Sequence, residues 1–249
     1  MDQTLHYQLV KPEDSLVDYV YCFSSLQNLS SINEGVVIPN GKIDLIFSKT
    51  ADNVLNIALL GLETKPKYAR LDIISFFSIS FNPLAIAYIF KFSVADILNS
   101  GKILPNNFWD FSIDDLNDFG AFCEKASQKI LSLLPKEVDE RKRKLFELIA
   151  EANGEISIKE LSEKLFWTER QINRYFNQQF GLSIKAYCNI LRFQASLQHI
   201  AEGKLFPQLN FTDQSHFIKE IKQLSGVSPK ELHKNKNDRF LQFLMYNKQ

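Results

Sequence analysis

Two segments near the C-terminal end of the chain follow the same plan. Residues 169–187 read ERQINRYFNQQFGLSIKAY, and residues 213–232 read DQSHFIKEIKQLSGVSPKEL. Each combines a helical spacing of apolar residues with a Phe or Leu shortly before a glycine, then a hydrophobic residue, a serine and the start of a new helix. Such self-similarity indicates one structural unit used twice. Short helices that are joined tightly and punctuated by glycine are typical of a helix-turn-helix.

Capping patterns place the helices of this half. Three Ser or Thr residues stand three positions before Glu or Gln, which is the pattern of a capping box: Ser157/Glu160, Thr168/Gln171 and Ser228/Glu231. They predict helices over residues 158–166, 169–180 and 229–236. Apolar periodicity predicts two more, over residues 141–152 and 184–201.

The second segment also raises the question of catalysis, because Asp213, Ser215 and His216 are the side-chain types of a hydrolase triad. On a helix, neighbouring side chains point about 100° apart, so Ser215 and His216 diverge and do not share a proton. A nucleophile and its base normally meet from distant parts of a chain. Asp213 suits the N-cap of the helix that follows it. The segment is therefore interpreted as a polar reading surface.

Charge divides the chain. Residues 1–140 carry 11 Lys and Arg against 18 Asp and Glu, a net of −7, whereas residues 141–249 carry 18 against 11, a net of +7. This asymmetry indicates a nucleic-acid-binding half attached to another domain. The alternative is an ordinary fluctuation of surface charge. We expect domains over residues 1–137 and 138–249.

The first half is predicted to consist mainly of strands, which makes the whole chain α+β. Strands are expected over residues 19–23, 55–62 and 71–81, and Asn40-Gly41 between two apolar runs predicts a hairpin over residues 36–47. Two peripheral helices are expected, over residues 83–92 and 112–134, the second opened by a Ser112/Asp115 capping pair. A small barrel or curled sheet fits this order. Its Phe-rich interior is expected to offer an apolar pocket between residues 19–23 and 71–81, or else to be only core.

Composition excludes several classes of protein. Three widely spaced cysteines fit buried thiols in a reducing compartment, and the four histidines show no metal-ligand spacing. No apolar run reaches the roughly 18 residues of a membrane span, and residues 1–10 lack the pattern of a signal peptide. Paired carboxylates, a Cys/His arrangement and a phosphate-binding loop are not recognisable. We expect a soluble, cytoplasmic protein that is not an enzyme and needs neither a metal nor a cofactor.

From Phe146 onward, the chain resembles the AraC/XylS family of bacterial transcription regulators, most specifically in DQSHFIKEIKQLSGVSPKEL. The resemblance implies two helix-turn-helix units, held by a long linker helix over residues 184–201, whose recognition helices enter successive major grooves of DNA. The segment AEGKLFPQLNF is shorter than in the family, and Asn210 stands where glycine is usual. We therefore expect the supporting helix of the second unit to be reduced to a turn.

The N-terminal half resembles, through YVYCF and VIPNGKIDLIF, an uncharacterised domain that precedes such regulators. Other family members bind small effectors in a cupin-like barrel there, or dimerise through helices beside it. The partners implied for this chain are double-stranded DNA at a promoter or operator, a small-molecule effector, a second copy of the chain and RNA polymerase. No membrane partner is expected.

Arginine pairs well with guanine and asparagine with adenine, so polar residues on the outer faces of the two recognition helices are the expected readers. These candidate DNA-binding residues are Arg170, Asn173, Arg174, Gln214, Ser215, His216 and Lys219. The alternatives are a solvated basic face for the first helix and a helix-packing role for His216. Trp167 is interpreted as a hydrophobic staple, and residues 141–144 (RKRK) either touch the DNA backbone or are simply solvated.

The favoured function is a sequence-specific DNA-binding transcription regulator with an N-terminal sensing or dimerising domain. Two alternatives remain at this point. One is an enzyme whose DNA-binding half is ancillary. The other is an adaptor that uses its helices as a scaffold for protein interaction.

Overall fold

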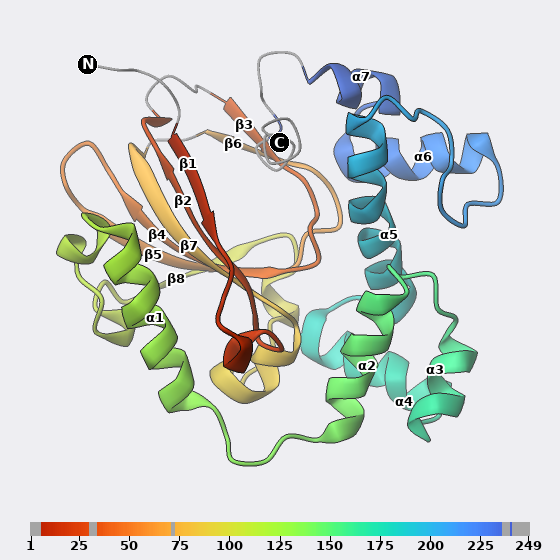
Figure 1. The fold of residues 1–249 in the computed structure, drawn as a ribbon, viewed down its shortest axis with the longest axis horizontal. Coiled ribbons are helices and arrows are strands. Elements are labelled where there is room, and N and C mark those ends of the chain that lie inside the picture. Colours follow the sequence, from red (N-terminus) through yellow and green to blue (C-terminus); the bar gives the residue numbers. More distant parts are fainter. Residues whose placement is uncertain (1–5, 30–33, 71–72, 236–239, 241–249) are drawn as a thin grey trace.

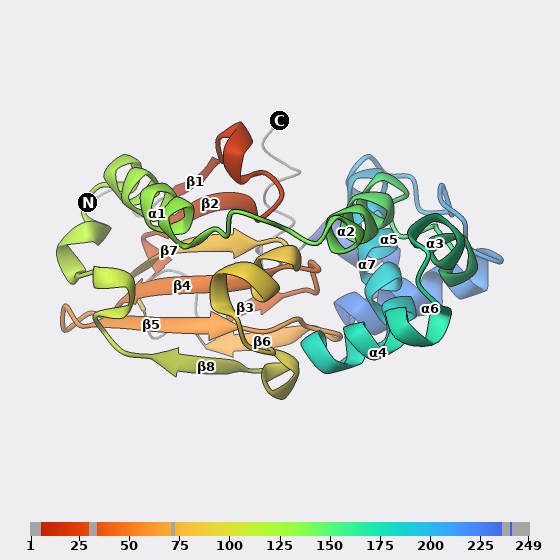
Figure 2. The same ribbon diagram turned by 90° about the horizontal axis from the view of Figure 1, so that it is seen from below.

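The computed structural model describes residues 6–29, 34–70, 73–235 and 240 of the 249-residue chain. A strand-rich part comes first, and a helical part follows it along the chain (Figure 1). The fold class is thus α+β, as the sequence predicts. The two parts lie side by side, joined by the segment between α1 (Phe119–Leu133) and α2 (Glu140–Glu151) (Figure 2). The predicted domain boundary after residue 137 falls in this segment.

The strand-rich part contains a six-stranded antiparallel sheet in the order β1-β2-β7-β4-β5-β8. Its strands are β1 (His6–Val10), β2 (Val20–Gln27), β4 (Ile43–Lys49), β5 (Leu55–Leu60), β7 (Ser75–Phe81) and β8 (Gly101–Leu104). Strands β3 (Glu34–Val37) and β6 (Lys67–Arg70) form a separate two-stranded sheet. Within the described residues β1 and β8 are edge strands that do not pair with each other, so the sheet is open and a closed barrel is ruled out.

The remaining helices of the second part are α3 (Ile158–Leu165), α4 (Glu169–Phe180), α5 (Ile184–Ala201), α6 (Gln214–Ser225) and α7 (Pro229–Lys234). All three predicted capping boxes are present, each with both reciprocal hydrogen bonds. Such caps are local, since they satisfy amides of the first helical turn within four residues. The predicted bounds 169–180 and 184–201 are confirmed to the residue. Residue 236, the predicted end of the last helix, lies outside the described residues.

The hairpin predicted at Asn40-Gly41 is wrong. Gly41 does adopt a positive φ of 71°, but β3 pairs with β6, and β4 pairs with β5 and β7. Asn-Gly permits a tight turn of several kinds, and both flanking apolar runs find other partners. The turn instead leads from one sheet to the other. It brings Gly41 against α5, where an added Cβ would lie 2.8 Å from the Leu191 side chain.

The long helix predicted over residues 112–134 is two elements. The Ser112/Asp115 capping box forms, but it opens only the 3-10 helix η6 (Ile113–Leu116). A second cap, Asp118, then opens α1 by accepting a hydrogen bond from the Ala121 amide. The two capping residues, Ser112 and Asp118, stand six positions apart. Each begins a helix of its own, so the single predicted helix is divided. The short helix predicted over residues 83–92 is a π-helical turn, η3 (Ile86–Phe90).

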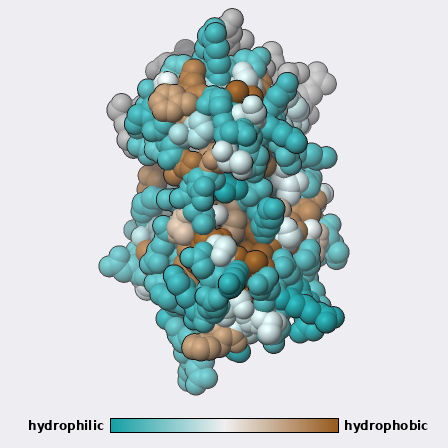
Figure 3. Space-filling view, turned by 90° about the vertical axis from the view of Figure 1, so that its right-hand side faces the viewer, coloured by the Kyte–Doolittle hydropathy of each residue, from teal (hydrophilic) through white to brown (hydrophobic). Residues whose placement is uncertain are grey.

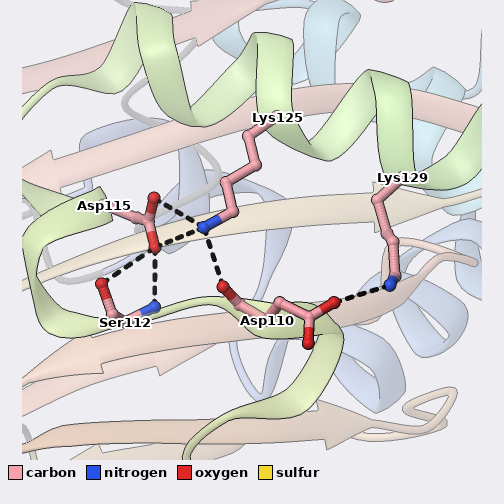
Figure 4. A network of polar contacts seen from close by, with 5 residues as sticks. All are labelled: Asp110, Ser112, Asp115, Lys125 and Lys129. Carbon is pink, nitrogen blue, oxygen red and sulfur yellow. Dashed lines mark hydrogen bonds and ion pairs between the residues drawn. The ribbon is translucent and has the colours of Figure 1, made fainter.

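A polar network fastens α1 to the segment before it (Figure 4). Asp115 accepts hydrogen bonds from the Ser112 amide at 2.6 Å and from Lys125 Nζ at 2.8 Å. Lys125 also donates to the Asp110 carbonyl at 2.8 Å, and Lys129 forms an ion pair with the Asp110 carboxylate at 3.0 Å. Burial raises the pKa of Asp115, but the Lys125 and Ser112 hydrogen bonds outweigh it and leave that pKa below its usual value.

One face of the six-stranded sheet is closed by α1. Phe47 and Phe77 on the sheet each lie 5.2 Å, ring centroid to centroid, from Phe122 on α1, and all three side chains are at most 1% exposed. Phe111 packs into the same group, 4.7 Å from Phe47. The Phe-rich face is therefore filled core. A pocket does lie between the two predicted segments, since Tyr21 and Cys22 of the first and Phe76, Ser78 and Ser80 of the second line a cavity, but this cavity is on the opposite face of the sheet.

The strand-rich part also touches the helical part near the C-terminal end of α4. The Ser93 hydroxyl donates to the Gln178 carbonyl at 2.6 Å, and the Val94 amide donates to the Gln179 carbonyl at 2.9 Å. These bonds satisfy carbonyls that a helix end leaves open.

Candidate nucleic-acid interface

The first helix-turn-helix unit consists of α3 and α4. Thr168 caps α4 by accepting a hydrogen bond from the Gln171 amide at 3.2 Å, and Gly181 ends the helix with a φ of 75°. Ile172 and Phe176 are fully buried, as their spacing predicts. Because these residues fix which side of α4 faces the core, the opposite side is turned to solvent.

Arg170 and Arg174 lie on that exposed side of α4, one helical turn apart. Neither side chain has a recorded hydrogen bond or ion pair with any described residue, so both guanidinium groups are available to a ligand. Asn173 is half-buried, and its carbonyl accepts a hydrogen bond from Asn177. Among the three candidates on this helix, the two arginines are therefore the better placed.

The second unit consists of α6, α7 and the loop that leads into α6. Asp213 caps α6 by accepting a hydrogen bond from the His216 amide at 2.8 Å. Phe217 and Ile221 are at most 2% exposed and face the core. Ser215 is exposed, and no hydrogen bond between Ser215 and His216 is recorded among the described residues. Asp213 thus serves as the cap that its position predicts.

Two of the four candidates on α6 already have partners inside the protein. Gln214 Nε2 donates to the Leu205 carbonyl at 3.0 Å. His216 Nε2 lies 3.4 Å from Glu220 Oε1, with its ring beside Phe211. These two side chains organise the loop before α6 and the core beneath it.

Ser215 and Lys219 are exposed one turn apart on α6, with no recorded partner among the described residues. Lys222 is exposed three positions further along the same side, and Ile218 is 39% exposed between them. Lys222 was not among the residues predicted from the sequence, although the three- and four-residue spacing that relates Ser215 to Lys219 would have identified it. Ile218 belongs to the apolar run of this helix in the sequence and is nevertheless partly exposed.

Comparison with known proteins bears directly on this pair of units. Residues 161–235 match the family model described as a helix-turn-helix domain. This chain carries an AraC-type helix-turn-helix domain. Domains of this type bind DNA, so the chain is a DNA-binding transcription regulator. Residues 8–101 match a second family model, a domain of unknown function (DUF6597).

Solved structures of ToxT from Vibrio cholerae are also similar to this chain. One, from strain O395, is 15% identical, covers 86% of this chain and 98% of its own, and has a TM-score of 0.42. Another, of ToxT bound to (E)-4-(8-methylnaphthalen-1-yl)but-3-enoic acid, is 16% identical, covers 93% and 98%, and has a TM-score of 0.40. The search of curated proteins found no match.

In the AraC-type domain, the supporting helix of the second unit is reduced, as predicted from its short sequence. Residues 202–213, all of which the structure describes, form no helix between α5 and α6. The loop is nevertheless fastened: the Asn210 amide donates to the Glu155 carboxylate, and Arg192 on α5 donates to the Asn210 carbonyl at 3.2 Å. Arg192 also lies 3.6 Å from Glu220 on α6. Side-chain contacts to the linker helix thus replace part of the missing helical support.

The basic segment at the start of α2 is engaged within the protein. Arg141 pairs with Asp139 at 3.2 Å, Arg143 with Asp18 at 3.2 Å, and Lys144 with Glu147 at 2.9 Å. To contact the DNA backbone, these side chains would have to give up their ion pairs within the protein, so the structure does not favour such contact.

Trp167 is half-buried in the turn of the first unit. Its ring lies 5.8 Å from that of Tyr175 on α4 and 5.3 Å from the Arg141 guanidinium. These contacts agree with a packing role at the turn.

The side of the molecule that carries the AraC-type domain is mostly hydrophilic, with smaller areas of hydrophobic surface (Figure 3). Of its large apolar side chains, Phe166 is 93% and Phe206 58% exposed. Among the described residues, no helix has both the length and the apolarity to cross a membrane. Nor do three His, Cys, Asp or Glu side chains gather there as a metal site would require.

Proposed function

We propose that this regulator reads a specific DNA sequence with α4 and α6, which enter two successive major grooves. The observation that carries the proposal is the pair of exposed polar helix faces, Arg170 with Arg174 and Ser215 with Lys219, on two capped helices joined by α5. A major groove admits one α-helix, and side chains on its outer face reach the base edges.

Within this proposal the candidate residues divide by role. Arg170 and Arg174 are base readers, because a guanidinium donates two parallel hydrogen bonds to guanine. The half-buried Asn173 would contact a base as well after its side chain rotates toward the DNA. Ser215 contacts a base edge or phosphate at the start of α6, and Lys219 contacts phosphate.

We propose for Gln214 and His216 a different role from the one that their positions predict. Their bonds to the Leu205 carbonyl and to Glu220 hold the start of α6 in place. Rigid support of this kind matters because base readout needs side chains in fixed geometry. We therefore propose that they act on DNA through the position of α6.

The charge of the second half supports DNA as the ligand. Its net charge of +7 stands against −7 for the first half. Cations that contact phosphates release condensed counterions from DNA, which makes such binding strongly dependent on salt.

The salt dependence of DNA binding tests the proposed function. With the full-length chain and labelled promoter fragments, the logarithm of the binding constant should fall with the logarithm of salt concentration, with a slope steeper than about −3, because four or more phosphates are neutralised. A gel-shift titration between 50 and 200 mM salt measures this. Weak binding that does not change over that range would count against the groove model and favour an adaptor.

We further propose that the N-terminal part controls DNA binding in response to a small effector. Its Phe-rich face is filled, but a cavity of about 590 Å³ lies between the other face of the sheet and helices α2 and α5. Helix α5 joins both DNA-reading units, so a ligand in this position would contact the element that sets their geometry. Dimerisation stays a second mode of control, and a measurement of molecular mass would test it.

A further inference from the structure

The cavity between the two parts of the chain has one wall from each. The sheet contributes alternate residues of β2, β4 and β7, which point away from the Phe-rich core, among them Asp44, Ser78 and Ser80. The helical part contributes Phe146 of α2 and Leu191 of α5. Its volume of about 590 Å³ is within the range of small-molecule sites.

Several polar side chains of the cavity are already hydrogen-bonded to one another. Lys42 Nζ donates to Asn82 Oδ1 at 2.8 Å. Asp44 accepts hydrogen bonds on both carboxylate oxygens, from the Ser80 hydroxyl at 2.5 Å and from Asn40 Nδ2 at 3.4 Å. These are the bonds that an ammonium and a carboxylate make.

Burial opposes both charges. It lowers the pKa of Lys42 to about 8, and it raises the pKa of Asp44, whereas the Ser80 and Asn40 hydrogen bonds and the Lys42 charge act to lower the latter. Because both Asp44 oxygens accept hydrogen bonds and Lys42 Nζ donates one, we take Asp44 to be ionised while Lys42 carries its proton. The two charges then sum to zero.

The charged groups at the rim are also compensated. Arg143 pairs with Asp18 at 3.2 Å, and Glu147 pairs with Lys144 at 2.9 Å. A ligand with a net charge would therefore lose its hydration without gaining an uncompensated opposite charge, which is costly in a buried site.

Apolar side chains supply much of the remaining lining. Leu26, Leu60 and Phe76 from the sheet face Phe146 and Leu191 from the helices. The cavity thus offers both hydrogen-bonding groups and apolar surface to a ligand.

We infer that this cavity binds an uncharged amphipathic molecule, with a hydroxyl, amide or ester head group at Lys42 and Asp44 and an apolar body between the sheet and α5. The inference deepens the proposed effector control and rests on it. The head group would exchange hydrogen bonds with the hydroxyls and amides of Ser78, Ser80 and Asn82.

The same segment that carries Lys42 is bonded to the linker helix. Tyr187 on α5 donates from its hydroxyl to the Gly41 carbonyl at 3.3 Å, and Gln194 Nε2 donates to the Pro39 carbonyl at 2.5 Å. A molecule bound at Lys42 displaces or stabilises this segment and so changes the hold on α5. A ligand shifts the equilibrium between two conformations only if it binds one of them more tightly than the other. Here the two conformations would differ in whether the Tyr187 and Gln194 hydrogen bonds to this segment are formed.

Three ten-carbon probes that differ only in head-group charge test the inference: 1-decanol, decanoate and decylammonium. Calorimetry on the full-length protein without DNA should show 1-decanol bound at least about tenfold more tightly than either ion, because neither ion finds an uncompensated partner. Binding of an ion as tight as that of 1-decanol, or no binding of any probe, would overturn it. Since DNA is absent, this outcome is separate from failure of the salt titration above.

Charge variants sharpen the test. Asp44→Asn leaves Lys42 uncompensated and should shift the preference toward decanoate by about tenfold, whereas Lys42→Met leaves Asp44 and should shift it toward decylammonium. If Asp44 and Lys42 only stabilised the fold, both substitutions would weaken the binding of all three probes to the same extent. If the Asp44→Asn variant does not fold, the preference of the Lys42→Met variant between decanoate and decylammonium tests the head-group assignment by itself. An unchanged order of preference would contradict the assignment of the head group.

Two further measurements complete the design. Ala195→Phe fills the cavity from α5 and should abolish probe binding, whereas Ala121→Phe, exposed on α1, should not. Saturation with 1-decanol should change DNA affinity at least threefold, since the occupied segment holds α5. Unchanged DNA affinity at saturation would overturn the regulatory half of the inference.

Discussion

Replacing Arg174 with alanine is expected to lower the affinity for the preferred DNA site by about 10- to 100-fold and to relax the preference at one base position. This corresponds to about 1–3 kcal/mol for a bidentate contact to a base. Arg174 is exposed on a helix that is capped at both ends and packed through Ile172 and Phe176. Quantitative binding to the preferred site and to its single-base variants measures both effects.

Lys219→Ala provides the comparison from the second unit. An ammonium at phosphate carries little sequence information, so this variant should weaken all sequences evenly and reduce the salt slope by about one. Lys222→Ala is expected to behave in the same way. Lys136→Ala, an exposed cation between α1 and α2, is the control and should leave binding unchanged. If the Lys219 variant loses base preference while Arg174→Ala keeps it, the second unit is the principal reader.

Gly154→Ala should have the largest effect on stability. Gly154 follows α2 with a φ of 74°, and an added Cβ would lie 2.2 Å from the Cys188 carbonyl oxygen of α5. The left-handed conformation costs a non-glycine residue about 1–2 kcal/mol, and overpacking adds about 1–3 kcal/mol. The sum of roughly 2–5 kcal/mol corresponds to a fall in Tm of about 4–20 °C. Thermal unfolding followed by circular dichroism measures it.

Gly203→Ala separates the cost of the left-handed backbone conformation from the cost of overpacking. Gly203 has a φ of 80°, but its added Cβ would meet only the His233 ring, at 3.7 Å. This variant carries the conformational cost without the backbone collision, so about 1–2 kcal/mol is expected. Equal losses for the two glycines would show that a Cβ at position 154 does not collide with the Cys188 carbonyl oxygen.

The helical half was predictable because its signals are local. A capping box or a C-terminal glycine acts within one helical turn, so Thr168/Gln171 and Gly181 define α4 whatever surrounds it. The shortened support before α6 also followed from length alone. The contacts that compensate for it, from Arg192 and Glu155, join residues far apart and leave no local pattern.

The strand-rich half was predicted in some of its strands but not in their pairing. The strand over residues 55–62 is present as β5, and that over 71–81 as β7, although residues 71 and 72 lie outside the described residues. Pairing is decided by competition among strands across the sheet. The Asn40-Gly41 turn shows this, because its local hairpin signal loses to two non-local pairings.

The candidate site shows the same division. Periodicity identified which residues of α4 and α6 face outward, and the exposure of Arg170, Arg174, Ser215 and Lys219 agrees with it. It did not reveal that Gln214 and His216 bond within the protein, because their partners lie in a loop and on the next turn. The cavity was expected between residues 19–23 and 71–81, and both segments line it, but on the face of the sheet opposite the Phe-rich one. Alternation along a strand shows two faces but does not say which one a helix fills.

Selection of bound sequences from a random DNA library tests the central claim most directly. The account predicts enriched sequences with two specified segments centred about ten base pairs apart, the spacing of successive major grooves. Of these, the segment read by α4 should be the more sharply defined, and Arg174→Ala should blur only that segment. Retention of DNA without enrichment of any sequence, or one segment that survives loss of both Arg170 and Arg174, would contradict it.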